Sequence, residues 1–350
     1  MKKYKSKVVR VGPYKLGGNN PVRIQSMCNT DTRNVETTVK QIKILEKAGC
    51  EIIRVAVPDM KAAKVIGKIK EQINIPLVAD IHFDHRLALE SIKQGVDKVR
   101  INPGNIGSDE NVKAVVMACK KNKIPIRIGI NGGSLEKDIL KKYKGRGTAK
   151  GMVESAMRHI KILEKHNFKN ILISLKASDI ERTVEAYRML ARKVNYPLHI
   201  GITEAGTTFR GTVMSSIGLG ILLYDGIGAT IRVSLTADPV EELKVAWEIL
   251  KSLKLRQRGV SITSCPTCGR TEIDIISLAK KVEDATQSSE KNIHIAVMGC
   301  VVNGPGEARE ADIGVAGGKN CGVIFAKGKI IKTVKEKEIL KELLKEIKKI

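Results

Sequence analysis

The segment Ile53-Arg54-Val55-Ala56 is a short run of β-branched residues with an arginine at its second position. The same order of residue types (apolar, arginine, apolar, small or polar) recurs in three further segments: Val99-Arg100-Ile101-Asn102, Ile126-Arg127-Ile128-Gly129 and Ile231-Arg232-Val233-Ser234. Val22-Arg23-Ile24-Gln25 is a weaker fifth copy. Runs rich in valine and isoleucine that are bounded by turn-forming residues are typical of β-strands. These segments therefore predict several strands of one sheet.

Eight such β-rich runs occur between residues 20 and 250: Val22–Met27, Ile52–Val57, Pro76–Phe83, Lys98–Asn102, Pro125–Asn131, Asn170–Lys176, Pro197–Thr203 and Ala229–Leu235. Segments with the apolar periodicity of helices lie between them, for example Val39–Ala48, Met152–His166 and Val240–Leu253. Eight alternating β–α units predict the α/β class and a (β/α)8 TIM barrel. The alternative is a doubly wound open sheet, which usually has fewer strands.

The composition changes after residue 256. Two cysteine-containing segments, Ser261–Gly269 and Ile293–Glu307, precede β-rich runs at Gly322–Ala326 and Ile330–Val334 and an amphipathic helix at Glu336–Ile350. We therefore expect two domains, a TIM barrel over residues 1–256 and a small α+β domain over residues 257–350.

The charge balance is strongly basic. The 350 residues include 62 Lys and Arg against 37 Asp and Glu, a formal net charge of +25. Nucleic acid, an anionic membrane surface, or a phosphorylated small molecule together with an acidic protein donor would each fit this charge, and so would lysines that merely solvate helix faces. Aromatic residues are only 3% of the chain, which argues against binding of single-stranded nucleic acid by base stacking. No long apolar run and no secretory signal is evident, so we expect a cytoplasmic protein without a membrane span.

The arginines of the repeated strands share one side of the sheet. Side chains alternate between the two faces of a strand, so arginines point into a barrel whose valines and isoleucines pack outward against helices. Lys176 and Ser174 share one face of their strand, as Asp80 and His82 do on theirs. About five cations at one barrel mouth suit a ligand with several negative charges, such as a diphosphate. The alternative is that the cations pair with Asp80 and Glu204 or lie in solvent at the bottom rim.

Other residues near the strand ends add candidates. The turns Asn102-Pro103-Gly104-Asn105 and Asn131-Gly132-Gly133-Ser134 follow two of the arginine strands and could offer backbone N–H groups to phosphate. Glu204 ends the seventh predicted strand, where it is either an acid–base group or a counter-ion of the arginines. His82 and His199 are interpreted as hydrogen-bonding walls of the site or as catalysts.

A cysteine constellation marks the second domain. Cys265-Pro266-Thr267-Cys268-Gly269 is a C-x-x-C knuckle, and Cys300 follows in the segment Met298-Gly299-Cys300-Val301-Val302-Asn303-Gly304-Pro305-Gly306-Glu307. Three thiolates can hold an iron–sulfur cluster with an unusual fourth ligand, and Glu307 lies within reach. A closed zinc site would need to recruit Cys321 or His294, and a redox dithiol is a third possibility.

These two cysteine motifs resemble the bacterial 4-hydroxy-3-methylbut-2-enyl diphosphate synthase family of the methylerythritol phosphate route to isoprenoids. The runs Val22–Met27 and Ile202-Thr203-Glu204-Ala205-Gly206 resemble it too, and the resemblance covers essentially the whole chain. It implies a TIM barrel followed by a domain with a [4Fe–4S] cluster, whose ligands would be Cys265, Cys268, Cys300 and Glu307. It also implies that Glu204 is an acid at the reacting carbon and that the diphosphate is held by nine residues: Arg54, His82, Arg100, Arg127, Asn131, Lys176, Thr203, Arg232 and Ser234.

The activity implied by this resemblance is reductive ring opening and dehydration of 2-C-methyl-D-erythritol 2,4-cyclodiphosphate. Two electrons would arrive one at a time through the cluster from an acidic flavodoxin or ferredoxin, in a homodimer in which one chain's cluster domain caps its partner's barrel. The alternative is a basic nucleic-acid-binding protein with a zinc knuckle. That alternative predicts arginines on an exposed face, zinc in the purified chain and binding that weakens steeply with salt.

Overall fold

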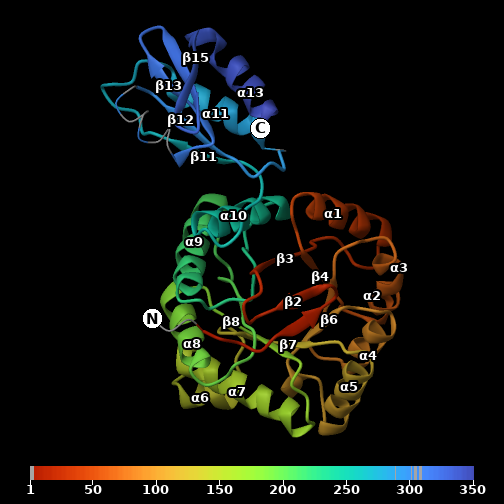
Figure 1. Ribbon diagram of the computed structural model, residues 1–350. Coiled ribbons are helices and arrows are strands. Elements are labelled where there is room, and N and C mark those ends of the chain that lie inside the picture. Colours follow the sequence, from red (N-terminus) through yellow and green to blue (C-terminus); the bar gives the residue numbers. More distant parts are fainter. Residues whose placement is uncertain (1–3, 288, 301, 303–305, 307–309) are drawn as a thin grey trace. The chain divides into compact units, whose positions relative to one another are not determined.

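The computed structural model describes residues 4–287, 289–300, 302, 306 and 310–350. The chain divides into two compact units, Met1–Arg256 and Gln257–Ile350 (Figure 1). Each unit has its own hydrophobic core. Within the described residues, no helix combines the length and the apolar character that crossing a membrane requires.

Eight parallel strands form the centre of the first unit: β3 (Arg23–Met27), β4 (Ile52–Ala56), β5 (Leu77–Asp80), β6 (Lys98–Ile101), β7 (Ile126–Asn131), β8 (Ile171–Lys176), β9 (His199–Ile200) and β10 (Thr230–Ile231). Their order in the sheet is β8-β7-β6-β5-β4-β3-β10-β9. A parallel bridge from Ile173 to Leu198 joins the two ends of this order, so the sheet closes into a barrel. Each of the eight predicted runs supplies one strand. The prediction of a TIM barrel is confirmed, and the open-sheet alternative is wrong.

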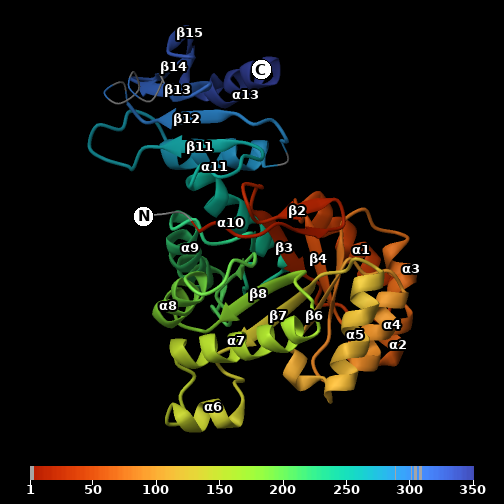
Figure 2. The same cartoon turned by 60° about the horizontal axis from the view of Figure 1, so that its bottom comes forward.

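Helices surround this barrel (Figures 1 and 2). They are α1 (Val35–Lys47), α2 (Met60–Lys64), α3 (Ile66–Lys70), α4 (His85–Lys93), α5 (Asp109–Lys121), α6 (Lys137–Lys142), α7 (Ala149–Lys165), α8 (Ile180–Ala191), α9 (Thr208–Tyr224) and α10 (Pro239–Ser252), with a 3-10 turn η1 (Pro103–Asn105) after β6. Several begin at an Asn or Asp whose side chain accepts a backbone N–H, as Asn34 does from Thr37. α1 ends before Gly49, whose φ of +98° suits glycine because it has no Cβ.

A hairpin covers one end of the barrel. β1 (Val9–Val11) and β2 (Tyr14–Leu16) pair antiparallel, and their apolar side chains pack against residues at or near the starts of the barrel strands. The cluster contains Val9, Val11, Leu16, Ile52, Val78, Leu172 and Ala229. The sequence analysis did not identify this hairpin, because strands of three residues leave little periodicity to recognise. Since the N-terminal ends of the strands are plugged, a ligand has access only from their carboxyl ends, where TIM barrels place their active sites.

The second unit is a five-stranded mixed sheet with helices. Its strands are β11 (Ser261–Ser264), β12 (His294–Met298), β13 (Ile313–Gly318), β14 (Cys321–Ala326) and β15 (Lys329–Lys335), in sequence order across the sheet. β11, β12 and β13 are parallel to one another, and β14 is antiparallel to both of its neighbours, β13 and β15. Among the described residues the unit also contains α11 (Ile275–Thr286), η2 (Glu336–Glu338) and α13 (Ile339–Lys349), and α11 and α13 bury their apolar faces on the sheet. The predicted small α+β domain is confirmed, although β13 and α11 were not identified from the sequence.

Candidate active site

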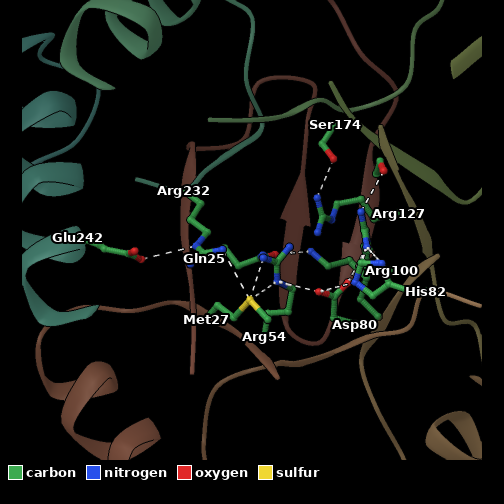
Figure 3. Close-up of polar contacts among 12 residues, drawn as sticks. Gln25, Met27, Arg54, Asp80, His82, Arg100, Arg127, Ser174, Arg232 and Glu242 are labelled. Carbon is green, nitrogen blue, oxygen red and sulfur yellow. Dashed lines mark hydrogen bonds and ion pairs between the residues drawn. The ribbon is translucent and has the colours of Figure 1, made fainter. Parts of the chain in front are cut away.

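The arginines of the repeated strands lie inside the barrel (Figure 3). Their apolar neighbours, such as Ile53 and Val55, are buried in the core shared with the helices. Arg100 donates from Nη2 to the carbonyl oxygen of Gly129 at 3.0 Å, and Arg127 donates from Nη1 to Oγ of Ser174 at 2.7 Å. These bonds reach from one strand to the next across the interior, as the alternation of side chains predicts.

Arg23, the weaker fifth copy, does not belong to this group. It lies at the start of β3 and forms an ion pair with Glu51, which precedes β4. Arg256 pairs with the same carboxylate at 3.1 Å. The bottom rim therefore has its own counter-ion, and the cations inside the barrel are a separate set.

Lys98 is an interior cation that the sequence analysis missed. Its side chain is fully buried on β6, two residues before Arg100, and its Nζ donates to Oε1 of Gln25 at 2.9 Å. Strand parity alone would have identified it, since Lys98 and Arg100 point to the same side. Lys176 adds a further cation. A Cβ placed on Gly201 would lie 2.7 Å from its Nζ, so the ammonium lies against the backbone at the end of β9.

Burial makes these cations costly in the absence of a ligand. It lowers the pKa of Arg127, Lys98 and Lys176 well below ordinary values, and it lowers the pKa of Arg54 to about 10. Neighbouring arginines add repulsion in the same direction. Within the described part of the chain, Nε and Nη2 of Arg127 and Nε of Arg100 are buried without a hydrogen-bond partner. Unpaired buried donors favour binding of an anion that brings several acceptor oxygens.

Two buried carboxylates offset part of this charge. Asp80 lies 3.1 Å from Nη1 of Arg100 and 3.8 Å from Nε of Arg54. Burial raises the pKa of Asp80, but the surrounding arginines and His82 lower it more, so its pKa is far below its ordinary value. Glu242 of α10 lies 3.5 Å from Nε of Arg232. The sequence analysis missed Glu242 because it is on a helix, outside the strand pattern.

A methionine lies between two of the guanidinium groups (Figure 3). Sδ of Met27, at the end of β3, is 3.0 Å from Nε and 2.9 Å from Nη2 of Arg54. It is also 3.6 Å from Nη1 of Arg232. A thioether is a weak and uncharged acceptor, so it separates the two cations without neutralising them. Nothing in the sequence pattern distinguished this methionine from a core residue.

The remaining predicted residues lie at or just beyond the carboxyl ends of the strands. His82 is exposed and contacts Nη1 of Arg100 through Nε2 at 3.0 Å. Asn131 accepts a hydrogen bond from the N–H of Gly133 in its own turn at 2.9 Å. Thr203 and Ser234 are partly buried, and both follow strands that end earlier than predicted, at Ile200 and Ile231.

Glu204 lies in the β9–α9 loop rather than at the end of a strand. It is exposed, and its φ of +54° is in the left-handed region, which is unusual for a residue other than glycine. Strained backbone of this kind occurs preferentially at functional sites. His199, by contrast, is fully buried, and its Nδ1 shares a hydrogen bond of 2.8 Å with Oγ1 of Thr230. Burial lowers the pKa of His199, because it disfavours the protonated form of the ring.

Three cysteines of the second unit lie beyond the carboxyl ends of two neighbouring parallel strands. Cys265 follows β11 directly, and Cys300 follows β12 by two residues, in a register that pairs Ser264 with Val297. The N–H of Gly299 donates to Sγ of Cys265 at 3.2 Å. Cys268 is exposed on the intervening turn. Three thiols near two adjacent strand ends, one of them accepting a backbone N–H, are a donor set of the kind that holds an iron–sulfur cluster.

Among the described residues, no three His, Cys, Asp or Glu side chains converge on a point that could hold a metal ion, and this applies to the three cysteines as well as to a zinc knuckle. His294, which a zinc site would have recruited, has both ring nitrogens engaged, Nε2 with Thr263 at 2.7 Å and Nδ1 with the carbonyl oxygen of Glu310 at 3.1 Å. Glu307, the predicted fourth cluster ligand, lies outside the described residues. The arginines are inside the barrel, whereas the nucleic-acid alternative required them on an exposed face.

Comparisons with known proteins agree with both units. Residues 6–247 match the model of the GcpE TIM-barrel domain, and residues 261–349 match that of the GcpE protein C-terminal domain. A protein of Caldanaerobacter subterraneus, named 4-hydroxy-3-methylbut-2-en-1-yl diphosphate synthase (flavodoxin), is 62% identical over 97% of this chain and 96% of its own length. A protein of Clostridium perfringens with the same name is 60% identical over 99% of both chains.

Solved structures also match the barrel. The HPPK-DHPS protein of Plasmodium falciparum, bound to pterin and p-hydrobenzoate, superposes with a TM-score of 0.50 at 13% identity. The match covers 71% of this chain and 50% of that one. At this low identity the likeness is one of fold alone.

Proposed function

Because this chain belongs to the GcpE family, we propose that it is a flavodoxin-dependent oxidoreductase of isoprenoid biosynthesis, a 4-hydroxy-3-methylbut-2-en-1-yl diphosphate synthase. Its reaction is the reductive ring opening and dehydration of 2-C-methyl-D-erythritol 2,4-cyclodiphosphate. The observation that carries the proposal is the group of interior cations whose buried N–H donors have no partner in the described part of the chain. A cyclic diphosphate supplies the acceptor oxygens and the negative charge that such a group lacks.

The diphosphate is held at the carboxyl ends of the strands. Arg127 lies deepest of the arginines and has two free donor atoms, so it binds a phosphate oxygen between β7 and β8. Arg54 and Arg232 exchange their weak contact with Met27 for phosphate oxygens, since a phosphate is the stronger acceptor. Arg100 and Lys176 complete the electrostatic site. His82, Asn131, Thr203 and Ser234 line its rim as further polar contacts.

Cys265, Cys268, Cys300 and Glu307 would hold a [4Fe–4S] cluster. When bound, such a cluster supplies electrons to the substrate one at a time. The chain's own contribution is to orient the thiols: the Gly299 N–H fixes Cys265, and the register of β11 with β12 sets the distance between the two cysteine segments. A carboxylate as fourth ligand is a weaker ligand to iron than a thiolate, which leaves that position exchangeable.

Glu204 serves as the proton donor in this proposal. The reaction releases a hydroxyl group as water, so a proton must reach the leaving oxygen. Glu204 is exposed on the loop that follows β9, beside the carboxyl ends of strands that carry the cations. The backbone of Glu204 is in the left-handed region, a strained conformation that is found preferentially at functional sites.

Flavodoxin is the proposed electron donor, as the names of the relatives indicate. Flavodoxins and ferredoxins are acidic, and the net charge of +25 steers an acidic partner toward this chain. A ferredoxin would be steered in the same way, so the charge alone does not distinguish the two carriers.

A homodimer is also part of the proposal. One face of α9 exposes Phe209, Val213, Ile217 and Tyr224, and the 17 residues of this helix contain a single charge, Arg210. Two copies of so basic a chain repel each other, so they associate best through an uncharged face, and an apolar stripe is complementary to itself. Ile217→Lys should convert a dimer to a monomer in analytical ultracentrifugation, whereas Met117→Lys, on an exposed residue of α5, should not. A monomeric parent protein at micromolar concentration would contradict this part.

Metal analysis of the anaerobically purified protein tests the proposed chemistry. We expect about four iron atoms and four acid-labile sulfides per chain, with an electron paramagnetic resonance signal on reduction. Cys300→Ser should lose iron and activity together, whereas Cys321→Ser, which changes a cysteine of β14, should keep both. Zinc without iron after anaerobic reconstitution, with nucleic-acid binding that weakens steeply with salt, would instead support the zinc-knuckle alternative.

A further inference from the structure

A small cavity of about 170 Å³ lies beside the cation site, between the turns that follow β6 and β7 and against helix α7. It is lined by Asn102, Asn105, Ile130, Ser134, Leu135, Glu136, Lys137, Ser155 and His159. None of the roles assigned above uses His159 or Glu136. The two turns are the ones whose glycines and asparagines the sequence analysis singled out.

His159 of α7 connects both turns. Its side chain is 2% exposed, and its Nδ1 accepts a hydrogen bond from the N–H of Gly104 at 3.0 Å. On the other side of the ring, Nε2 lies 3.1 Å from Oε1 of Glu136, which belongs to the loop after β7. Since Nδ1 accepts, the proton of the neutral ring is on Nε2, where it faces the carboxylate. The ring thus accepts a hydrogen bond from the turn after β6, and its Nε2 lies within ion-pair distance of the carboxylate in the loop after β7.

The contact between His159 and the turn requires glycine at position 104. A Cβ on residue 104 would lie 2.8 Å from Cε1 of His159 and 3.3 Å from its Nδ1. Any larger residue would push the ring away from the turn. Glycine at this position lets the backbone of η1 reach the imidazole.

The turn after β6, which His159 contacts, is also connected to Arg100, one of the proposed substrate-binding residues. Asn102, two residues before Gly104, accepts from the N–H of Gly129 at 2.9 Å through Oδ1. Arg100 donates to the carbonyl oxygen of the same Gly129 at 3.0 Å. Gly129 of β7 is therefore bonded through its N–H to Asn102, just after β6, and through its carbonyl oxygen to Arg100 of β6. The position of the turn after β6 thus affects where the Arg100 guanidinium lies.

We propose that His159 is a positioning residue for substrate binding: a single neutral imidazole fixes the turns after β6 and β7 against α7 and so holds the Arg100 side of the diphosphate site. This inference rests on the proposed function, because it concerns the same site. His159 does not touch the substrate. It acts through Gly104, Asn102 and Gly129, and its loss should weaken binding more than it slows the bound substrate.

Three variants test this proposal by steady-state kinetics with the cyclodiphosphate and a reduced electron donor. His159→Leu removes both ring contacts, and we expect KM to rise about tenfold with kcat within about twofold of the parent. His159→Gln can accept at Oε1 and donate at Nε2, so it should return KM to within about threefold. His166→Leu is the matched control, since His166 is the C-cap of the same helix and its imidazole pairs with Asp109 of α5 rather than with either turn, and it should leave KM unchanged.

Gly104→Ala provides the second line of evidence should His159→Leu fail to fold. It keeps the imidazole but displaces it from the turn, and it should raise KM as His159→Leu does. A KM equal to the parent's in whichever of these two variants folds would overturn the inference, as would equal effects of Leu and Gln at position 159. Absence of turnover in the parent enzyme itself would overturn the proposed function and, with it, this inference. The two failures are thus distinct.

Discussion

Gly129→Ala isolates the contribution of Arg100 without altering any charge. A Cβ on residue 129 would lie 2.3 Å from Nε, 2.8 Å from Nη2 and 3.0 Å from Cζ of Arg100. The methyl group and the guanidinium cannot occupy these positions together. Because the guanidinium is the end of a flexible side chain, it is the group that moves, and it leaves both the Gly129 carbonyl and Asp80.

The size of the effect follows from the interaction that is lost. Hydrogen bonds to charged groups contribute about 1.5–3 kcal/mol, and about 1.4 kcal/mol corresponds to a factor of ten in affinity. Displacement of one guanidinium from the diphosphate should therefore raise KM by about 10- to 150-fold. The variant should also unfold at a lower temperature than the parent, because the displaced guanidinium leaves Asp80, and the lower entropy of alanine in the unfolded chain offsets only part of this loss.

A double-mutant cycle provides the decisive assay. KM and the melting temperature are measured for Gly129→Ala, Arg100→Ala and the double variant, with Met117→Ala, on an exposed residue of α5, as the control. If Gly129→Ala acts through Arg100, it should cost almost nothing further in the Arg100→Ala background. Additive losses, or an unchanged KM in Gly129→Ala with normal stability, would refute the placement of Arg100 in the substrate site.

Three further predictions concern the charges of the site. Asp80→Asn should lower the free energy of unfolding by about 3–5 kcal/mol in denaturant titrations, because Arg54 and Arg100 lose their carboxylate, and added pyrophosphate should restore part of it. The depressed pKa of Asp80 also means that the parent loses this stability as pH falls below about 3.9, a loss that Asp80→Asn should not show. Met27→Glu should raise KM more than tenfold, since a carboxylate would compete with the diphosphate for two guanidinium groups, whereas Met27→Leu should change KM less than about threefold; equal effects of the two would refute the role of a neutral acceptor. Glu204→Gln should keep iron and substrate binding but lose about 10²- to 10⁴-fold in kcat, and full turnover would show that Glu204 is not the proton donor.

The interior of the barrel was largely predictable because it depends on one periodicity. Strand runs rich in valine and isoleucine, with one arginine each, leave few arrangements that bury the apolar residues and still hydrate or pair the cations. That argument located Arg54, Arg100 and Arg127. It also contained Lys98, which a stricter use of the same parity would have found.

Side-chain contacts between elements that are distant in the sequence were not predictable. Glu242 reaches Arg232 from a helix, and Met27 contacts two arginines by virtue of how strands β3, β4 and β10 lie next to one another. Such pairings depend on tertiary packing, which a linear pattern does not encode. Arg23 illustrates the opposite error, since it has the right residue type in the right pattern but lies at the other end of its strand.

The spacing of the cysteine motifs identified the second domain, but it did not predict which strands of that domain pair with one another. The C-x-x-C knuckle and Cys300 were evident in the sequence, whereas the parallel pairing of β11 with β12 that brings their segments together is a long-range contact. Strand β13, which extends that sheet, has the run Ile-Gly-Val-Ala-Gly-Gly, whose glycines obscure its strand character.

The most direct test of the account is product analysis with the anaerobically reconstituted protein, 2-C-methyl-D-erythritol 2,4-cyclodiphosphate and reduced flavodoxin. The account predicts one 4-hydroxy-3-methylbut-2-enyl diphosphate, identified by mass spectrometry, for about every two electrons consumed, with Cys300→Ser inactive. Unchanged cyclodiphosphate after incubation with iron-loaded protein would contradict it.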